Sequence, residues 1–187
     1  MSLLVSVAPA RPLVRPRSRE AAWAWVVLGS LGLALAARVR LPLPFTPVPV
    51  TAQTFAVLLL AAALGARRGV QAVLLYLVWG ALGAPVFSQG GGWAYLLGPT
   101  GGYLLGMVGM AAVVGAVAER TPPSSWRFWA AFVLGEAVLY ALGLAWLSRF
   151  VGWPQAVALG LTPFVIPDGL KGLAAAALAA WAYGRRA

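Results

Sequence analysis

The sequence predicts an all-α membrane protein with six transmembrane helices, and composition together with the length of its apolar runs carries that prediction. Of the 187 residues, 61% are hydrophobic and only 10% are charged, with a mean hydropathy of +0.85. Soluble domains carry about 25% charged residues, and a fold of this length cannot hide so much apolar surface from water. Lipid is therefore the expected solvent, and one compact domain is expected.

Six continuous apolar segments follow a basic N-terminal tail, residues 1–20, which is expected to be disordered. The segments cover about 21–37, 51–66, 70–84, 101–118, 126–148 and 166–184. Several are near the shortest length that crosses about 30 Å of hydrocarbon. Because they are continuous rather than alternating, a transmembrane barrel is disfavoured. The chain thus divides into the tail and a six-helix transmembrane domain over residues 21–187.

The arginines between the apolar segments predict the orientation in the membrane. With the N-terminus inside, ten arginines fall in cytoplasmic segments and three in outer ones, a strong positive-inside bias. Both termini are therefore expected in the cytoplasm, in a multi-pass protein of the plasma membrane. The ten are Arg11, Arg15, Arg17, Arg19, Arg67, Arg68, Arg120, Arg127, Arg185 and Arg186, and the three are Arg38, Arg40 and Arg149.

Composition excludes several classes of function. The net charge of +10 is spread between apolar runs rather than gathered in one patch, so nucleic acid is not an expected partner. With no Cys and no His, thiolate and imidazole metal sites and the usual neutral-pH base are absent, and neither an enzyme nor a metal site nor a cofactor is expected. No GxxxxGK[ST] phosphate loop occurs, so any ATP-driven step needs another protein.

Two unusual loops lie on the predicted outer face. Residues 41–50 hold four prolines, which forbid a helix there, and residues 85–100 are rich in glycine and carry no charge. Irregular backbone at membrane depth is tolerated where protein buries it or where it lines a cavity. Glycine also lets backbone groups approach a ligand closely. These loops are therefore expected to help form a ligand site open to the outside.

Charged residues inside apolar segments are the strongest site candidates. Asp168 and Lys171 are three residues apart and share one helix face. An ionisable pair within the membrane indicates a functional site, although a structural ion pair that orients the last helix is the alternative. Glu136 lies mid-segment, with Tyr140 one turn later, as a ligand group or as a protonated carboxyl bonded to a neighbouring helix. Glu119, at a segment end, is expected to be merely solvated.

Four stretches of the chain form a distinctive set of motifs. They read LPLPFTPVPVTAQTFAVLLLAAALGARRG, LYLVWGALGAPVF, GPTGGYLLG and LTPFVIPDGLKGLAAA, and they extend in consistent order from about residue 38 to 180. Together they resemble the BioY family, the biotin-binding S components of energy-coupling-factor transporters. The last resembles that family's final-helix motif, in which an acidic residue precedes a lysine by three. The resemblance implies a six-helix S-component fold that captures biotin from outside with high affinity.

The resemblance also implies partners for transport: a transmembrane coupling subunit and two ATPase subunits. S components resemble one another in docking the coupling subunit through small residues of the first helix, and Gly32 and Ala36 are the nearest match here. Small residues allow close helix approach. An S component for another vitamin, or a stand-alone facilitator, is the alternative function.

Biotin has a ureido ring, an apolar thioether ring and a carboxylate tail, so its site needs groups of several kinds. Asp168 would accept ureido N–H bonds, and Lys171 would donate to the ureido oxygen or attract the carboxylate. Because biotin is longer than this pair, loop groups are expected at its other end. The remaining candidates are polar residues, ring-packing aromatics and one arginine at the mouth: Gln53, Thr51, Gln89, Trp93, Tyr103, Tyr140 and Arg40.

Overall fold

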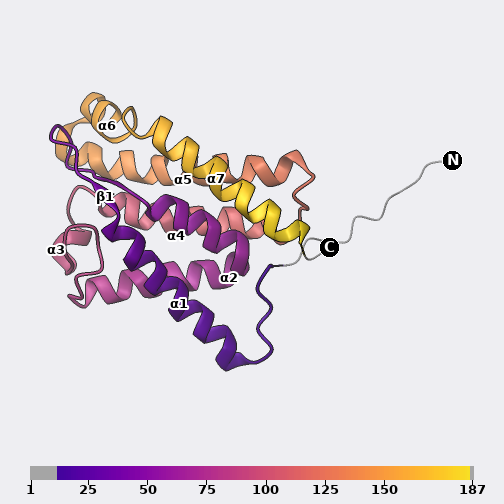
Figure 1. Ribbon diagram of the computed structural model, residues 1–187. Coiled ribbons are helices and arrows are strands. Elements are labelled where there is room, and N and C mark those ends of the chain that lie inside the picture. Colours follow the sequence, from indigo (N-terminus) through magenta and orange to yellow (C-terminus); the bar gives the residue numbers. More distant parts are fainter. Residues whose placement is uncertain (1–11, 186–187) are drawn as a thin grey trace.

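The computed structural model describes residues 12–185, a bundle of long helices with short elements at one end (Figure 1). Five of the helices are long and apolar enough to cross a membrane. The described elements are α1 (Arg19–Arg38), β1 (Arg40–Leu41), β2 (Val50–Thr51), α2 (Gln53–Ala81), α3 (Trp93–Leu96), α4 (Gly101–Ala118), α5 (Trp126–Val151), α6 (Trp153–Gly160) and α7 (Val165–Gly184).

Helix α2 is a hairpin of two arms that turn at Gly65. This glycine has φ +81° and ψ 175°, a backbone region that is essentially restricted to glycine. The side-chain amide of Gln53 donates to the hydroxyl of Tyr76 at 2.7 Å, whereas 23 residues of straight helix would separate the two by about 35 Å. The two arms are thus antiparallel, and the five apolar helices are compatible with the six predicted spans.

The first arm of α2, residues 53–64, is too short to cross the hydrocarbon alone. Twelve residues rise about 18 Å, against a hydrocarbon thickness of about 30 Å. The segment before it, residues 42–49, is irregular backbone between β1 and β2. Its two ends are held together by the antiparallel pairing of β1 with β2, in which Arg40 faces Thr51.

Side chains from α4 and α7 close the Gly65 turn at the predicted cytoplasmic end. Glu119 Oε1 accepts a hydrogen bond from the backbone N–H of Ala66 at 3.1 Å, and the hydroxyl of Tyr183 donates to the carbonyl of Ala62 at 3.0 Å. A Cβ at Gly65 would lie 1.9 Å from the Glu119 carboxylate. The expectation that Glu119 is merely solvated is therefore wrong, because its carboxylate satisfies a turn amide that has no helical partner.

The chain before α1 contacts the bundle. The predicted disordered tail runs to residue 20, and its first eleven residues lie outside the described part of the chain. From residue 12 onward, Leu13 is buried and the N–H of Val14 donates to the carbonyl of Ala63 at 2.9 Å. Helix α1 then begins at Arg19, because the side chain of Ser18 caps it by accepting from the N–H of Ala21.

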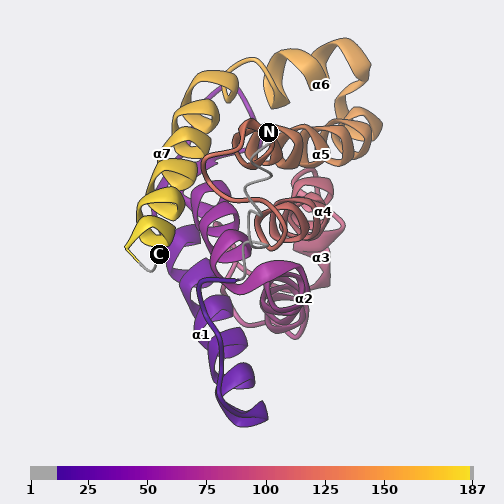
Figure 2. The ribbon, with the colours of Figure 1, turned by 90° about the vertical axis from the view of Figure 1, so that its right-hand side faces the viewer.

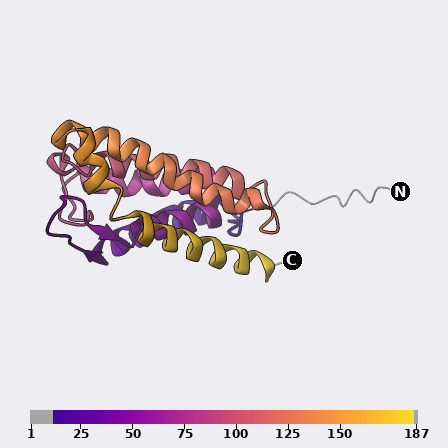
Figure 3. The ribbon, with the colours of Figure 1, turned by 90° about the horizontal axis from the view of Figure 1, so that it is seen from above.

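Helix α1 lies at one edge of the bundle and α6 at the opposite edge, as the end-on view shows (Figure 2). Helix α4 packs between α2 and α5, where glycines allow close approach: a Cβ on Gly115 would lie 2.4 Å from the backbone nitrogen of Ala66. Seen from above, β1, β2 and α6 gather at one end, and α7 ends at the other (Figure 3). The end with the strands corresponds to the predicted outer face.

Helix α6 is an element that the apolar pattern does not predict. Its eight residues follow Gly152, which ends α5 with φ +79°, and Pro154 lies in the first turn, where a missing N–H costs nothing. The hydroxyl of Thr46 donates to the carbonyl of Leu159 at 2.8 Å. Helix α6 thereby contacts the proline-rich loop at the outer end.

Candidate functional site

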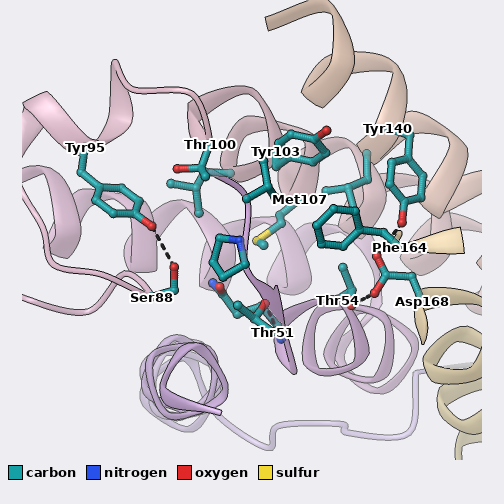
Figure 4. Close-up of a pocket in the computed structure, with 15 residues that line it drawn as sticks. Thr51, Thr54, Ser88, Tyr95, Thr100, Tyr103, Met107, Tyr140, Phe164 and Asp168 are labelled. Carbon is teal, nitrogen blue, oxygen red and sulfur yellow. Dashed lines mark hydrogen bonds between the residues drawn. The ribbon is translucent and has the colours of Figure 1, made fainter. Parts of the chain in front are cut away.

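The carboxylate of Asp168 lies in the first turn of α7, where three side chains donate to it, and Figure 4 shows two of these donors, Thr54 and Tyr140. Lys171 Nζ lies 2.7 Å from Oδ1, the hydroxyl of Thr54 donates to the same oxygen at 3.1 Å, and the hydroxyl of Tyr140 donates to Oδ2 at 2.6 Å. Asp168 is only 4% exposed. Bonds to an ionised acceptor are stronger than neutral ones, so these donors stabilise a buried negative charge.

The ammonium of Lys171 also ties α7 to the end of the proline-rich loop. Besides the carboxylate of Asp168, it donates to the backbone carbonyl of Thr51 at 2.6 Å. A carboxylate offers about four acceptor positions, and the described donors occupy three. One position on Oδ2 is thus available to a ligand donor.

A cavity extends from Asp168 toward the outer loops. The space between its atoms, including open solvent at its mouth, is about 520 Å³. Met107, Leu139 and Phe164 give it apolar walls. The full lining is Val48, Pro49, Thr51, Gln53, Thr54, Ser88, Tyr95, Thr100, Tyr103, Leu104, Met107, Leu139, Tyr140, Phe164 and Asp168.

A second polar group lies across the cavity from Asp168. The hydroxyls of Ser88 and Tyr95 are 2.8 Å apart and hydrogen-bonded, and Figure 4 shows them on the opposite side from Asp168. The guanidinium of Arg40 donates to the backbone carbonyl of Ser88, and that of Arg38 donates to the carbonyl of Pro85. These arginines attach the glycine-rich loop to the end of α1. The cavity is therefore polar at both ends and apolar between them.

Two further polar residues of the cavity are anchored by the bundle. Gln53 donates to Tyr76, whose hydroxyl in turn donates to the carbonyl of Val86 at 3.3 Å. The hydroxyl of Tyr103 donates to the carbonyl of Gly160 at 2.8 Å. With that hydroxyl bound to α6, the ring of Tyr103 packs edge-on to the ring of Tyr140 and leaves an aromatic surface toward the cavity.

Five of the predicted site residues line this cavity, and Lys171 supports it from outside. They come from four segments that are distant in sequence, which the fold brings together: Thr51, Gln53, Tyr103, Tyr140 and Asp168. Lys171 is not among the lining side chains. It reaches the site through the carboxylate of Asp168 and the carbonyl of Thr51.

Four other predicted site residues lie away from the cavity lining. Gln89 lines a separate outer hollow beside the proline-rich loop, and Trp93 on α3 is 67% exposed. Arg40 acts on the backbone of the loop that carries Ser88. Glu136 lies one turn before Tyr140 and faces α7, where a Cβ on Gly172 would lie 2.5 Å from its Oε1.

Glu136 differs from Asp168 in its surroundings. Its Oε1 is the buried side-chain oxygen that has no hydrogen-bond partner among residues 12–185. Oε1 of Glu136 therefore does not form the predicted hydrogen bond to a neighbouring helix. Close packing against Gly172 accounts for its burial.

Three side chains at the polar ends of the cavity were not singled out by the sequence: Thr54, Ser88 and Tyr95. Thr54 is a polar residue next to Gln53 at the start of an apolar segment, and this polar position could have identified it as a site residue. Ser88 and Tyr95 lie in the glycine-rich loop, which was expected to contribute but gives no periodicity from which side-chain directions follow.

The predicted docking residues lie on α1, away from the cavity. Gly32 is exposed, and a Cβ there would meet nothing within 4 Å. Ala36 is half-buried one turn later, and large apolar side chains at Leu28, Leu31 and Leu35 are exposed on the same helix. This helix therefore has an apolar surface for lipid or for another membrane protein.

Comparison with known proteins agrees with this architecture. Residues 11–186 match the BioY family model. The chain is 42% identical over 135 residues to the biotin transporter BioY of Thermotoga maritima and 39% identical over 134 residues to a probable biotin transporter BioY of Pyrococcus horikoshii, in each case covering 71% of this chain and 79% of the relative.

A solved structure shares the fold. It is the crystal structure of the S-component for biotin from an ECF-type ABC transporter, with a TM-score of 0.76 at 19% identity, over 93% of this chain and 95% of that one. The family match extends over all the described residues, including both polar ends of the cavity. The chain belongs to the BioY family.

Proposed function

We propose that this chain is the biotin-binding S component of an energy-coupling-factor transporter in the plasma membrane, and that it captures biotin from the outer side. The observation that carries the proposal is the cavity with a buried carboxylate at one end and a hydroxyl pair at the other. The two relatives are biotin transporters and the structural neighbour is an S-component for biotin, which supports the choice of ligand.

The chemistry of biotin matches the two ends of the cavity. A ureido N–H can donate to the acceptor position that remains on Oδ2 of Asp168, and such a bond to an ionised group is strong in a dry site. The thioether ring then contacts Met107 and Phe164. The carboxylate tail points toward the hydroxyls of Ser88 and Tyr95, close to the loop that Arg40 holds.

Lys171 acts in this proposal as a positioning residue. It neutralises Asp168 at 2.7 Å and holds the carbonyl of Thr51 at 2.6 Å. A buried carboxylate without a cation would take up a proton or remain solvated rather than accept a ureido bond. The lysine therefore keeps the acceptor charged while the ligand contacts Asp168.

Transport requires partner proteins. By analogy with the family, these are a transmembrane coupling subunit and two ATPase subunits. Gly32 and Ala36 on the exposed face of α1 are the proposed contact with the coupling subunit. Gly32→Trp should then prevent complex formation in co-purification while biotin binding is retained. A complex that forms normally with Gly32→Trp would refute this contact.

The substrate is tested by the ligand content of protein purified from medium that contains biotin. Mass spectrometry should detect about one biotin per chain, and an excess of other vitamins should not displace labelled biotin. Displacement by another vitamin would favour the alternative, an S component of different specificity. Uptake into vesicles that contain this chain alone would favour a stand-alone facilitator.

A further inference from the structure

Two adjoining grooves at the predicted cytoplasmic end share a pair of arginines. Arg67 and Arg68, directly after the Gly65 turn, line both grooves. One groove is completed by Arg15 from the segment before α1, together with apolar residues of that segment. The other is completed by Arg19 at the start of α1. Four guanidinium groups from three parts of the chain therefore converge on one surface.

The positive charge of these grooves is largely unneutralised. Within residues 12–185 the ion pair that forms is between Lys171 and Asp168, at the opposite end of the bundle. The one carboxylate that lines either groove belongs to Glu119, and its Oε1 already accepts from the turn amide of Ala66. The surface consequently attracts an anion that the described chain does not itself supply.

The second groove also has an apolar side. Ala22, Trp23 and Val26 of α1 line it below Arg19, and Trp23 is 50% exposed. Residue 19 begins a membrane-crossing helix, so the arginines lie at headgroup level and the apolar residues lie progressively deeper in the membrane. Tryptophan is enriched at this interface, where its ring contacts both headgroup and acyl chain.

We propose that these grooves bind the phosphate headgroup of an anionic phospholipid of the inner leaflet. The guanidinium groups of Arg19, Arg67 and Arg68 would hold the phosphate, since arginine binds phosphate bidentately. An acyl chain would lie along Ala22 and Trp23. A soluble phosphate would use the arginines but would leave this apolar wall without an occupant, and for that reason a lipid fits the surface better.

The test compares lipid retention by two matched double variants. Arg67→Gln with Arg68→Gln removes two charges from the grooves, whereas Arg120→Gln with Arg127→Gln removes two charges from the same cytoplasmic face outside them. Each protein is placed in mixed micelles that contain phosphatidylglycerol or phosphatidylcholine with identical acyl chains. Bound lipid is counted by native mass spectrometry, and biotin binding checks that each variant is folded.

The groove variant should bind phosphatidylglycerol about tenfold or more weakly, because it loses two arginines that attract the anionic headgroup. The control variant should bind it as the unmodified chain does, and phosphatidylcholine should bind weakly to all three. A charge-retaining variant, Arg67→Lys with Arg68→Lys, should recover part of the affinity, because lysine keeps the charge but not the bidentate geometry. Recovery would show that the loss in the glutamine variant is not a folding defect.

Four results would overturn the proposal. Equal losses in both double variants would mean that diffuse surface charge attracts the lipid. If the unmodified chain bound phosphatidylcholine as well as phosphatidylglycerol, the arginines would not select an anionic headgroup. Displacement by millimolar glycerol phosphate would identify a site for soluble anions. Unchanged lipid binding by the groove variant, together with loss of the coupling subunit in co-purification, would identify a protein contact instead.

Discussion

Replacement of Asp168 by asparagine is the most direct test of the proposed ligand site. The change keeps the shape of the side chain but removes the charge and turns one acceptor into a donor. A hydrogen bond to a charged group contributes about 1.5–3 kcal/mol, and each 1.4 kcal/mol is tenfold in affinity. Loss of one such bond to a ureido N–H should therefore weaken biotin binding roughly 10- to 150-fold.

The fold should survive this replacement, because most donors keep a partner. Lys171 retains the carbonyl of Thr51, and the amide oxygen still accepts from one of the two hydroxyls, Thr54 or Tyr140, which donate to different oxygens of Asp168. Isothermal titration calorimetry on biotin-free protein measures the affinity, and thermal unfolding checks that the variant is folded.

A matched carboxylate-to-amide change is available as the control. Glu136→Gln alters a carboxyl on α5 whose Oε1 has no described hydrogen-bond partner and which does not line the cavity. It should bind biotin as the unmodified chain does. The reasoning fails if folded Asp168→Asn binds biotin within about threefold of the unmodified chain, since loss of one charged bond requires at least a tenfold effect. It also fails if Glu136→Gln loses as much affinity.

Three further changes test the supports of the site and of the fold. Lys171→Met should lower the free energy of unfolding by about 3–5 kcal/mol in chemical denaturation, because the buried charge of Asp168 loses its cation; a smaller loss than 1 kcal/mol would contradict this. Tyr140→Phe removes a hydrogen bond to a carboxylate, so it should lower the free energy of unfolding by about 1.5–3 kcal/mol and weaken biotin binding. Tyr183→Phe removes a hydrogen bond to a neutral carbonyl, so it should lower the free energy of unfolding by about 0.5–1.5 kcal/mol and leave the affinity for biotin unchanged. Gly65→Ala should destabilise the fold by about 1–3 kcal/mol through its backbone conformation alone, and unchanged thermal stability would show that the turn adapts.

The apolar helices are predictable from sequence because they depend on local properties, and their orientation in the membrane stays a prediction from the arginines. A continuous apolar run is a helix in lipid whatever its neighbours are, and the arginines at its ends record which side it faces. The predicted segment over residues 101–118 coincides with α4, and the predicted break at residues 67–69 lies beside the Gly65 turn. The contact between Asp168 and Lys171 is equally local, since residues three apart share a helix face.

Tertiary structure alone decided which other side chains meet at Asp168. Thr54 lies 114 residues from Asp168 in the sequence, and a periodic pattern of apolar residues does not predict contacts over such a separation. The loop residues Ser88 and Tyr95, which form the second polar end, have directions that depend on how irregular backbone packs against α1 and α2. The same limit explains why Gln89 and Trp93, polar and aromatic residues of that loop, lie outside the cavity. The sequence by itself thus determined the membrane class, the spans and one end of the site, because helices in lipid are specified locally; the shape of the cavity and its opposite end follow from long-range contacts.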